Sequence, residues 1–462
     1  MKKAIDYFYE ILEIPRASGS EGLIADYLEG FAKSHSLEFI RDGQNNVLIR
    51  KNGTGTPLVL QGHSDMVCEK NEGVPHDFSR DPIKTTADGD IIRACGTTLG
   101  ADDGISMAVM LTLLSDPTVS LPLECLVTSQ EEIGLLGMKA FDFSEIRGRM
   151  MINMDSMDEG IATVSCCGGV RTDIIIPAEA ASGSFKGYTL KVRGLYGGHS
   201  GEDINKNRGN AILISLSLLE NINNLRISEI SGGAKDNAIP RECTVSFTSD
   251  DSQLSDKIRS KEEEIRRTLC DDDCGFSISL ESADLNKVFS EKTTERIYSI
   301  ISQLSFGVIE MNPDIEGLVK TSANLGVISS DEESVKITVS SRSSDESVLD
   351  AIENKINSVS SSNNSSCLHS GRYPGWDFEK NSPLRELYLD TYRKLFNNEA
   401  SYEGIHAGLE CGIVKAALPD MDIISIGADI TSPHTPDETL NTASLERLYS
   451  TVREMIRRIE ED

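Results

Sequence analysis

The sequence predicts an α/β fold in which a domain that is discontinuous along the chain receives an inserted α+β domain. Three observations favour this arrangement. Short apolar runs alternate with helical apolar patterns in the first part of the chain, alternating strands and charged helices follow, and the first pattern then returns. Alternating strands and helices are typical of a mixed, mostly parallel sheet covered on both faces. We therefore expect one domain of residues 1–180 and 375–462, with residues 181–374 inserted between its two parts.

The first part of the split domain contains elements of both kinds. Three segments carry helical apolar spacing, at residues 4–13, 21–33 and 104–115. Pro15 and Gly19 separate the first two of these helices. Four apolar runs have the length of strands, at residues 47–50, 57–63, 123–129 and 149–155.

The insert begins where the pattern changes. Its expected elements are a linker of small residues, strands, charged helices and a polar loop. The linker is expected at residues 181–187 and the strands at 188–194 and 335–341. The charged helices are expected at 254–269 and 292–303, and the polar loop or turn at 358–366. After residues 373–376 (YPGW) the helix–strand pattern returns, with a helix at 384–396, a strand at 421–430 and a last helix from Ser444.

The charge balance excludes several classes of partner. The chain has 45 Lys and Arg against 74 Asp and Glu, which gives 45 − 74 = −29. Nucleic acids and anionic membrane surfaces require basic patches, so neither is expected as a partner. No stretch approaches the run of about 20 apolar residues that a membrane span needs.

The cysteines and the N-terminus favour a cytoplasmic location. The ten cysteines are scattered along the chain, as in proteins of a reducing compartment. The segment MKKAIDYFYEILEIP has no continuous apolar run and is not expected to be a signal peptide. Cys270 and Cys274 enclose three aspartates, but no second Cys or His pair lies nearby, so a solvated loop is favoured over a metal loop.

Several metal-ligand side chains follow predicted strands or begin a helix. They are His63, Asp102, Glu131, Glu132, Asp155 and His434. Ligands bind at the carboxyl ends of strands in parallel α/β sheets, so these residues are expected at one rim. Each alone has an ordinary explanation, such as helix capping by Asp102 or a turn at His434. Together with Asp65, however, the carboxylates would repel one another unless cations were bound.

Two divalent cations resolve this repulsion. We expect His63 and Asp155 on one ion and Glu132 and His434 on the other, with Asp102 bridging them. Imidazole and carboxylate ligands suit zinc, with manganese or cobalt as alternatives. Two residues remain without ligand duties: Asp65 is placed to orient the His63 imidazole, and Glu131 to act as the general base toward water.

The motifs around these residues resemble a known family. The segments GHSDMV (62–67), LGADDGISMA (99–108), SQEEIGLLG (129–137), NMDS (153–156) and PHTPDE (433–438) are similar to those of the co-catalytic zinc exopeptidases related to carboxypeptidase and aminoacylase. The further segments GGHSGEDI (197–204), DNAIPRE (236–242) and IHAGLECG (405–412) most resemble aminoacyl-histidine dipeptidases, also called Xaa-His or β-alanyl dipeptidases. The resemblance covers essentially the whole chain.

The resemblance implies a zinc-exopeptidase catalytic domain and roles for residues of the insert, which it identifies as a lid. It implies that His199 polarises the scissile carbonyl and that Asn237 and Arg342 hold the dipeptide. Without the resemblance, His199 would be interpreted as a turn residue and Arg342 as a solvated strand residue. His406 is expected either to shape the substrate pocket or to be structural, as is Glu410.

Two further expectations concern the bridging aspartate. The resemblance implies a cis peptide bond between Asp102 and Asp103. Asp103 also stands where relatives often have Asn, which adds a charge beside the bridge and leaves the metal preference open.

The sequence therefore predicts a metal-dependent enzyme that hydrolyses small peptides, namely dipeptides of Xaa-His or broader type. One alternative is an N-acyl amino acid deacylase or amidohydrolase with the same site; the long insert favours the dipeptidase. Another is a non-catalytic binding protein, which is disfavoured because the full ligand set and Glu131 are present. The sequence leaves open which dipeptides are preferred and whether the chain is a monomer or a homodimer formed through the lid.

Overall fold

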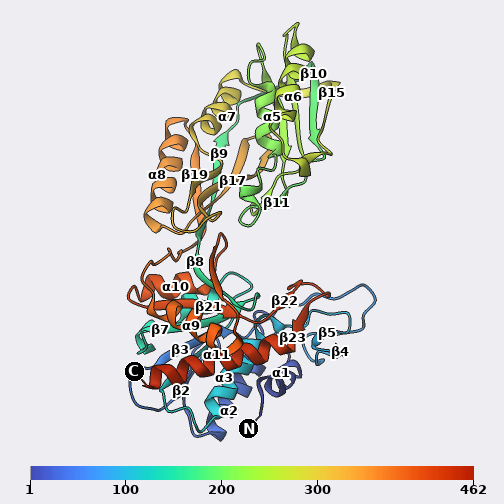
Figure 1. Cartoon of the computed structure of the whole chain (residues 1–462). Helices are drawn as coiled ribbons and strands as arrows, with labels where there is room; N and C mark the ends of the chain where they lie inside the picture. Colours follow the sequence, from blue (N-terminus) through green and yellow to red (C-terminus); the bar gives the residue numbers. More distant parts are fainter. Residues whose placement is uncertain (1, 462) are drawn as a thin grey trace. The chain divides into compact units, whose positions relative to one another are not determined.

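The structure is a computed structural model that describes residues 2–461. The chain forms two compact units (Figure 1). The first comprises the chain up to Cys166, Trp376–Gly404 and the chain from Leu409 onward; the second comprises Cys167–Gly375 and Ile405–Gly408. The first division lies before the expected boundary at residue 180, because strand β9 (Gly168–Pro177) pairs with strands of the second unit.

The first unit is built on an eight-stranded mixed sheet, as predicted. The strand order is β1 (Glu38–Arg41), β2 (Val47–Lys51), β6 (Leu123–Thr128), β3 (Leu58–His63), β7 (Met150–Ser156), β21 (Asp422–Gly427), β8 (Ile161–Cys166) and β20 (Ser401–Ile405). β3 lies parallel to both β6 and β7, and β21 lies parallel to β7. Every residue of β3 is buried, as expected for a central parallel strand. The carboxyl ends of β3, β6 and β7 therefore meet at one edge.

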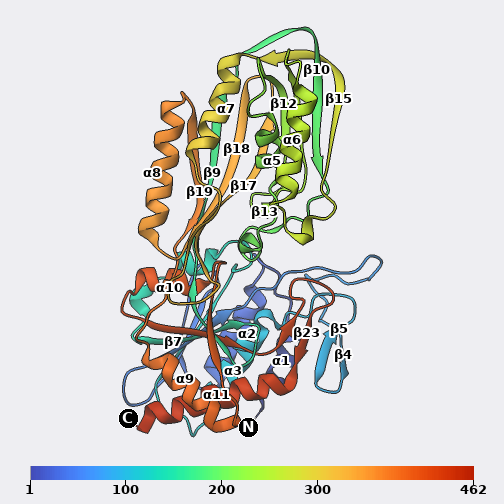
Figure 2. The ribbon, with the colours of Figure 1, turned by 45° about the horizontal axis from the view of Figure 1, so that its top comes forward.

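Helices pack against this sheet. They are α1 (Ala4–Leu12), α2 (Gly22–Ser34), α3 (Ala101–Ser115), α4 (Leu136–Ala140), α9 (Pro383–Phe396), α10 (Glu410–Ala417) and α11 (Thr442–Glu461). α3 is buried from Ala101 to Leu114, which explains why its sequence is apolar on all sides. α9 and α11 lie side by side (Figures 1 and 2).

A small antiparallel sheet joins distant parts of the first unit. It contains β22 (Ile430–Thr431), β23 (Thr439–Asn441), β5 (Ile91–Ala94) and β4 (Thr85–Asp88), in that order. The loop between β22 and β23 carries His434. This sheet thus fixes a C-terminal loop against a segment from the first hundred residues.

The second unit is an antiparallel sheet with helices. The strand order is β15 (Ser277–Phe289), β10 (Ala180–Arg193), β14 (Cys243–Thr248), β12 (Arg226–Gly232), β17 (Val319–Ser330), β18 (Ser334–Ser343), β9 and β19 (Ser366–Tyr373), with β16 (Gly307–Met311) also paired to β17. The helices are α5 (Ala211–Leu219), α6 (Leu254–Arg266), α7 (Glu291–Gln303) and α8 (Glu346–Ser362). Figure 2 shows α8 alongside β9 and β19. A two-stranded sheet pairs β11 (Gly198–His199) with β13 (Ala238–Ile239).

Two expected irregular segments of the insert are largely regular. Residues 181–187 are not a linker but belong to β10, which pairs with β15 along its length apart from a bulge after Ser182. Residues 358–366 were expected to form a polar loop or turn, but only 363–365 do so, because α8 continues to Ser362 and β19 begins at Ser366. Val359 and Ile356 bury the apolar side of that helix, and this packing overrides the weak helical preference of the serines. None of the helices within residues 2–461 is long and apolar enough to cross a lipid bilayer.

Candidate metal centre and active site

The structure brings the five predicted metal ligands of the first unit together with Glu131. Three groups of candidate ligand atoms form: one contains His63, Glu131 and Glu132, and the other two contain all five predicted ligands. His63, Asp102 and Asp155 form one of these two groups, and Asp102, Glu132 and His434 form the other; within each, the candidate ligand atoms lie within 4.8 Å of one another. Asp102 Oδ1 lies 3.0 Å from His63 Nε2, and Asp102 Oδ2 lies 3.0 Å from His434 Nε2. One carboxylate therefore faces both groups, which is the geometry of a bridging ligand.

Each of these side chains has a fixed origin in the fold. His63 ends β3 and Asp155 lies near the end of β7, whereas Asp102 begins α3. Glu132 follows β6, and His434 lies in the loop between β22 and β23 with a left-handed φ of 60°. The Asp102–Asp103 peptide bond is cis, as the sequence resemblance implied.

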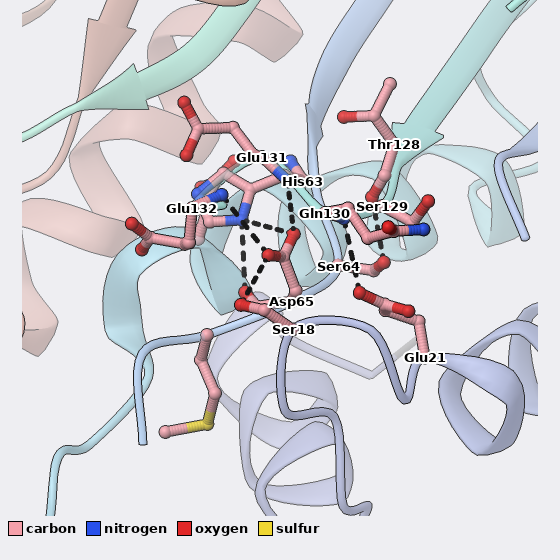
Figure 3. Close-up of polar contacts among 12 residues, drawn as sticks. Ser18, Glu21, His63, Ser64, Asp65, Thr128, Ser129, Gln130, Glu131 and Glu132 are labelled. Atoms are coloured by element: carbon pink, nitrogen blue, oxygen red, sulfur yellow. Dashed lines mark hydrogen bonds and ion pairs between the residues drawn. The ribbon is translucent and has the colours of Figure 1, made fainter. Parts of the chain in front are cut away.

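Asp65 connects the histidine to the glutamate pair (Figure 3). Its carboxylate accepts the backbone N–H groups of Glu131 and Glu132 at 3.0 and 3.3 Å, and the Ser18 hydroxyl at 2.8 Å. His63 Nδ1 lies 3.0 Å from the backbone carbonyl oxygen of Asp65 and 3.4 Å from its carboxylate. Asp65 therefore contacts the predicted ligand and also holds the turn that carries the predicted base.

Glu438 is a buried residue of this site for which sequence reasoning gave no role. Its two carboxylate oxygens accept four consecutive backbone N–H groups, those of residues 99–102, at 2.7–3.3 Å. These are the unpaired donors at the start of α3, where a negative charge is favoured. Glu438 thus fixes the segment that presents Asp102. Its position in PHTPDE, four residues after His434, is the one sequence signal that could have identified it.

Arg16 is a second residue that the sequence did not indicate. Its guanidinium is fully buried and donates hydrogen bonds to the carbonyl oxygens of Ser64 and Asp65, each at 3.0 Å, and to that of Gly100. Burial lowers the pKa of Arg16, while Glu438 and Asp65 oppose that shift. Arg16 therefore joins the loop after β3 to the loop before α3 with a positive charge among carboxylates.

The chain is similar to known proteins over nearly its whole length. Residues 59–458 match the model of peptidase family M20/M25/M40. The chain belongs to this family. This peptidase is 35% identical over 470 residues to the cytosol non-specific dipeptidase of Escherichia coli (strain K12), covering 98% of this chain and 97% of that protein. The predicted family is confirmed.

Solved structures agree with the fold. The crystal structure of the aminoacylhistidine dipeptidase from Vibrio alginolyticus superimposes with a TM-score of 0.92 at 32% identity, covering 98% of this chain and 96% of that chain. A tripeptidase from Staphylococcus aureus has a TM-score of 0.63 at 16% identity, covering 100% and 98% of the two chains, which supports the fold alone.

The electrostatics of the peptidase site fit bound cations. Burial raises the pKa of Asp155 to about 6, and it raises that of Glu131 well above its usual value, with nearby Asp155 and Glu410 adding to the shift. Close contact with the carboxylates of Asp102 and Glu132 raises the pKa of His434 to about 10. Without cations, the carboxylates of this site repel one another, and this repulsion favours protonated side chains. Bound divalent cations would remove the repulsion without protonation.

Glu132 provides a direct test of that fit. Its Oε1 is buried and has no hydrogen bond within residues 2–461, although it lies 2.9 Å from His434 Nε2. A buried carboxylate oxygen without a donor is costly unless a cation faces it. The donor set of imidazoles and carboxylates is the one that zinc and related divalent metals use. The residues present therefore fit a metal centre.

Glu410 contacts two residues of the central strands β3 and β6. Its Oε2 accepts hydrogen bonds from Gln61 Nε2 at 2.5 Å and from Thr128 Oγ1 at 2.6 Å. The side chain is fully buried, and burial raises the pKa of Glu410 to about 8. Between the two expectations for Glu410, these contacts with sheet residues favour the structural one.

The four predicted substrate-contacting residues lie in the second unit. His199 belongs to β11, and burial together with Arg342 lowers its pKa, which favours the neutral imidazole. The backbone carbonyl of Asn237 accepts the N–H of Ser200 at 2.8 Å, so Asn237 lies beside the His199 segment. These two predicted residues are therefore neighbours in the fold, although they are far apart in sequence.

Arg342 and His406 are both buried. Arg342 on β18 is 8% exposed and donates to the Tyr373 hydroxyl at 3.1 Å, and its Nε has no hydrogen-bond partner within residues 2–461. It is therefore not a solvated strand residue. His406 Nε2 lies 2.7 Å from the Ser322 hydroxyl, and burial and the charge of Arg342 lower the pKa of His406 to about 4. A buried guanidinium with unused hydrogen-bonding capacity suits an anionic ligand.

Proposed function

We propose that the chain is a metal-dependent dipeptidase that cleaves dipeptides of Xaa-His or broader type with a free carboxyl terminus. The observation that carries the proposal is the pair of ligand groups that share Asp102. The full-length similarity to two proteins named as dipeptidases supports the substrate class.

The proposed metal ligands are those of the two groups. His63 and Asp155 would hold one ion, Glu132 and His434 would hold the other, and Asp102 would serve both groups. Zinc is the proposed metal, with manganese or cobalt as alternatives, because imidazole and carboxylate suit all three. When bound, such a pair of cations polarises a carbonyl oxygen and makes water more acidic.

Glu131 is the proposed general base. Its carboxylate takes a proton from water as the water oxygen attacks the carbonyl carbon, and it delivers that proton to the leaving amine when the C–N bond breaks. Burial raises the pKa of Glu131, and a raised carboxyl pKa favours a group that must both accept and return a proton. Asp65 supports this role by holding the Glu131 backbone and the His63 imidazole.

Residues of the second unit are proposed to recognise the dipeptide. Neutral His199 donates an N–H to the oxygen that becomes negative during attack. Arg342 binds the terminal carboxylate with its planar fork of donors. Asn237 and His406 orient the dipeptide. The lid function of this unit is part of the proposal.

Deacylation of N-acyl amino acids by the same centre is the alternative, and the similarity to dipeptidases favours peptide cleavage. The proposed location is the cytoplasm, since all ten cysteines are free and that is typical of a reducing compartment. The proposed assembly is a monomer or a homodimer through the second unit.

One experiment tests the proposal. The purified chain is loaded with zinc, manganese or cobalt, its metal content is measured, and dipeptides and N-acyl amino acids are offered separately. We expect two metals per chain and faster hydrolysis of dipeptides. Hydrolysis of N-acyl amino acids alone would replace the proposal with the deacylase, and no hydrolysis at full metal content would refute both.

A further inference from the structure

The acidic segment between Cys270 and Cys274 is only in part the solvated loop that the sequence favoured. It forms a short 3-10 turn, Asp271–Asp273, in the second unit. Asp271 and Asp272 are exposed, but Asp273 is only 2% exposed. A buried aspartate requires hydrogen-bond donors, and those donors show what the segment does.

The carboxylate of Asp273 closes the loop that carries His199. Its Oδ1 accepts the backbone N–H of Tyr196 at 2.8 Å, and its Oδ2 accepts the backbone N–H of Gly209 at 2.6 Å. Tyr196 lies just before His199, and Gly209 lies ten residues after it. One side chain thus ties together the two ends of this loop.

The loop has little regular structure of its own. Its only strand, β11, contains two residues, and Gly197, Gly198 and Asn207 have left-handed φ values of 73°, 141° and 54°. A Cβ atom at Gly198 would lie 2.5 Å from a carboxylate oxygen of Asp203, so the backbone passes very close to that side chain. The position of His199 therefore depends on contacts from outside the loop backbone.

A second set of contacts runs from Asp272 to His199. Asp272 pairs with Arg208 Nε at 2.9 Å, and Arg208 donates to the Gly197 carbonyl at 2.8 Å. Arg208 also lies 3.2 Å from Asp203, whose carboxylate accepts the His199 backbone N–H at 2.7 Å. The chain of contacts therefore runs from Asp272 through Arg208 and Asp203 to the backbone N–H of His199. The Arg208 side chain is 9% exposed and that of Asp272 is 47% exposed, so only the part of this chain of contacts nearer to His199 is shielded from solvent.

We propose that Asp273, assisted by Asp272 through Arg208, is a positioning residue that fixes the His199 imidazole for catalysis. The inference rests on the proposed role of His199 as the donor to the carbonyl oxygen. Charged acceptors suit this task, because a carboxylate accepts two backbone N–H groups at once, whereas an amide offers only one oxygen.

The chain offers a matched control for the test. Asp271 precedes Asp273 by two residues, is exposed, and accepts no side-chain hydrogen bond within the described residues. Asp271→Asn and Asp273→Asn remove the same charge from the same turn. Only Asp273→Asn places an NH₂ group against one of two backbone donors, so only this variant should loosen the loop.

The experiment compares kcat, KM and metal content for Asp273→Asn and Asp271→Asn, each with His199 and with His199→Ala. We expect Asp273→Asn to lower kcat by about 10- to 100-fold, the effect of a small misplacement of a catalytic group, at unchanged metal content. Asp271→Asn should match the unmodified enzyme. In the His199→Ala background, Asp273→Asn should cause no further loss. Amide hydrogen exchange over residues 196–209 should be faster in Asp273→Asn alone.

The outcomes separate the inference from the proposed function. If Asp273→Asn lowers kcat equally with and without His199, or leaves it unchanged, the positioning role is refuted while His199 keeps its function. If His199→Ala itself leaves kcat unchanged, the proposed function of His199 fails and the inference fails with it. If Asp273→Asn does not fold, Asp272→Asn replaces it in the test. The inference then requires that Asp272→Asn lowers kcat when His199 is present and has no effect in the His199→Ala background.

Discussion

The carboxylate of Asp65 accepts the backbone N–H of Glu131 at 3.0 Å. Asp65 also lies 3.4 Å from the imidazole of His63, so a single side chain contacts both a proposed metal ligand and the turn of the proposed base. The positions of the ligand and the base are therefore coupled through Asp65.

Replacing Asp65 should impair metal binding and catalysis together. Asp65→Asn keeps the size of the side chain but turns an NH₂ group toward one of its donors, Glu131, Glu132 or Ser18. We expect a loss of about 10- to 100-fold in metal affinity or activity, typical of a residue that orients a ligand. Metal titration and kcat measure it, with Ser18→Ala as the control that removes only the hydroxyl bond. Full activity in Asp65→Asn would show that Asp65 is dispensable.

Substitutions of Glu131 and Glu132 should have different effects, because one is the proposed base and the other a proposed metal ligand. Glu131→Gln should retain both metals and lose about 10²–10⁴ in kcat, the usual contribution of a general base. Glu132→Ala should lose one metal, because its Oε1 faces His434 and Asp102 in the second ligand group. Metal content and kcat of both variants check this. Equal metal loss in the two variants would mean that the roles of base and ligand have been assigned wrongly.

Arg342 should select substrates by their carboxylate. Arg342→Ala should lower kcat/KM for dipeptides with a free carboxylate. The loss should correspond to about 2–5 kcal/mol of transition-state binding free energy, the cost of leaving a buried charge without its partner. The ratio of kcat/KM for free-acid dipeptides to kcat/KM for C-terminally amidated dipeptides should therefore fall. Arg171→Ala is the matched control, since Arg171 lies on the neighbouring strand β9 and pairs with Asp173. An unchanged acid-to-amide ratio in Arg342→Ala would place the carboxylate site elsewhere.

Glu410 should make stability depend on pH. Burial raises its pKa from 4.5 to about 8. A carboxyl group with a raised pKa contributes stability that is fully present below pH 4.5 and is lost as the pH rises through about 8. The free energy of unfolding should therefore fall between pH 5 and pH 8.5, and Glu410→Gln should reduce that fall. Urea unfolding at both pH values measures it; an identical fall in Glu410→Gln would rule out Glu410 as its source.

The sequence could predict residues whose position follows from a local pattern. His63 and Asp155 end apolar runs that were predicted as strands and are β3 and β7, so their meeting at one sheet edge could be expected. The helix at 104–115 was likewise predicted, although the structure begins it at Ala101. Glu132 and His434 lie a few residues beyond the predicted strands at 123–129 and 421–430, so the pattern places them less directly. The repulsion among the whole set of acids, which requires cations, supported their inclusion.

Glu438 and Arg16 could not be predicted, for a different reason. Both bind backbone groups of segments far away in sequence, and a backbone group carries no sequence signal. The same holds for Asp273, whose partners are the N–H groups of Tyr196 and Gly209. The end of α8 was missed because burial of Val359 outweighed the polar composition around it.

The strand order of the first unit has a consequence for protein synthesis. β21 lies between β7 and β8 in the sheet, yet its residues follow the entire second unit in the chain. His434 and Glu438 are translated later still. A nascent chain therefore lacks an interior strand, a proposed ligand and the carboxylate that holds Asp102 until its last few dozen residues leave the ribosome. We therefore expect fragments that end before residue 438 to lack peptidase activity, because the interior strand or the contacts that hold Asp102 would be missing.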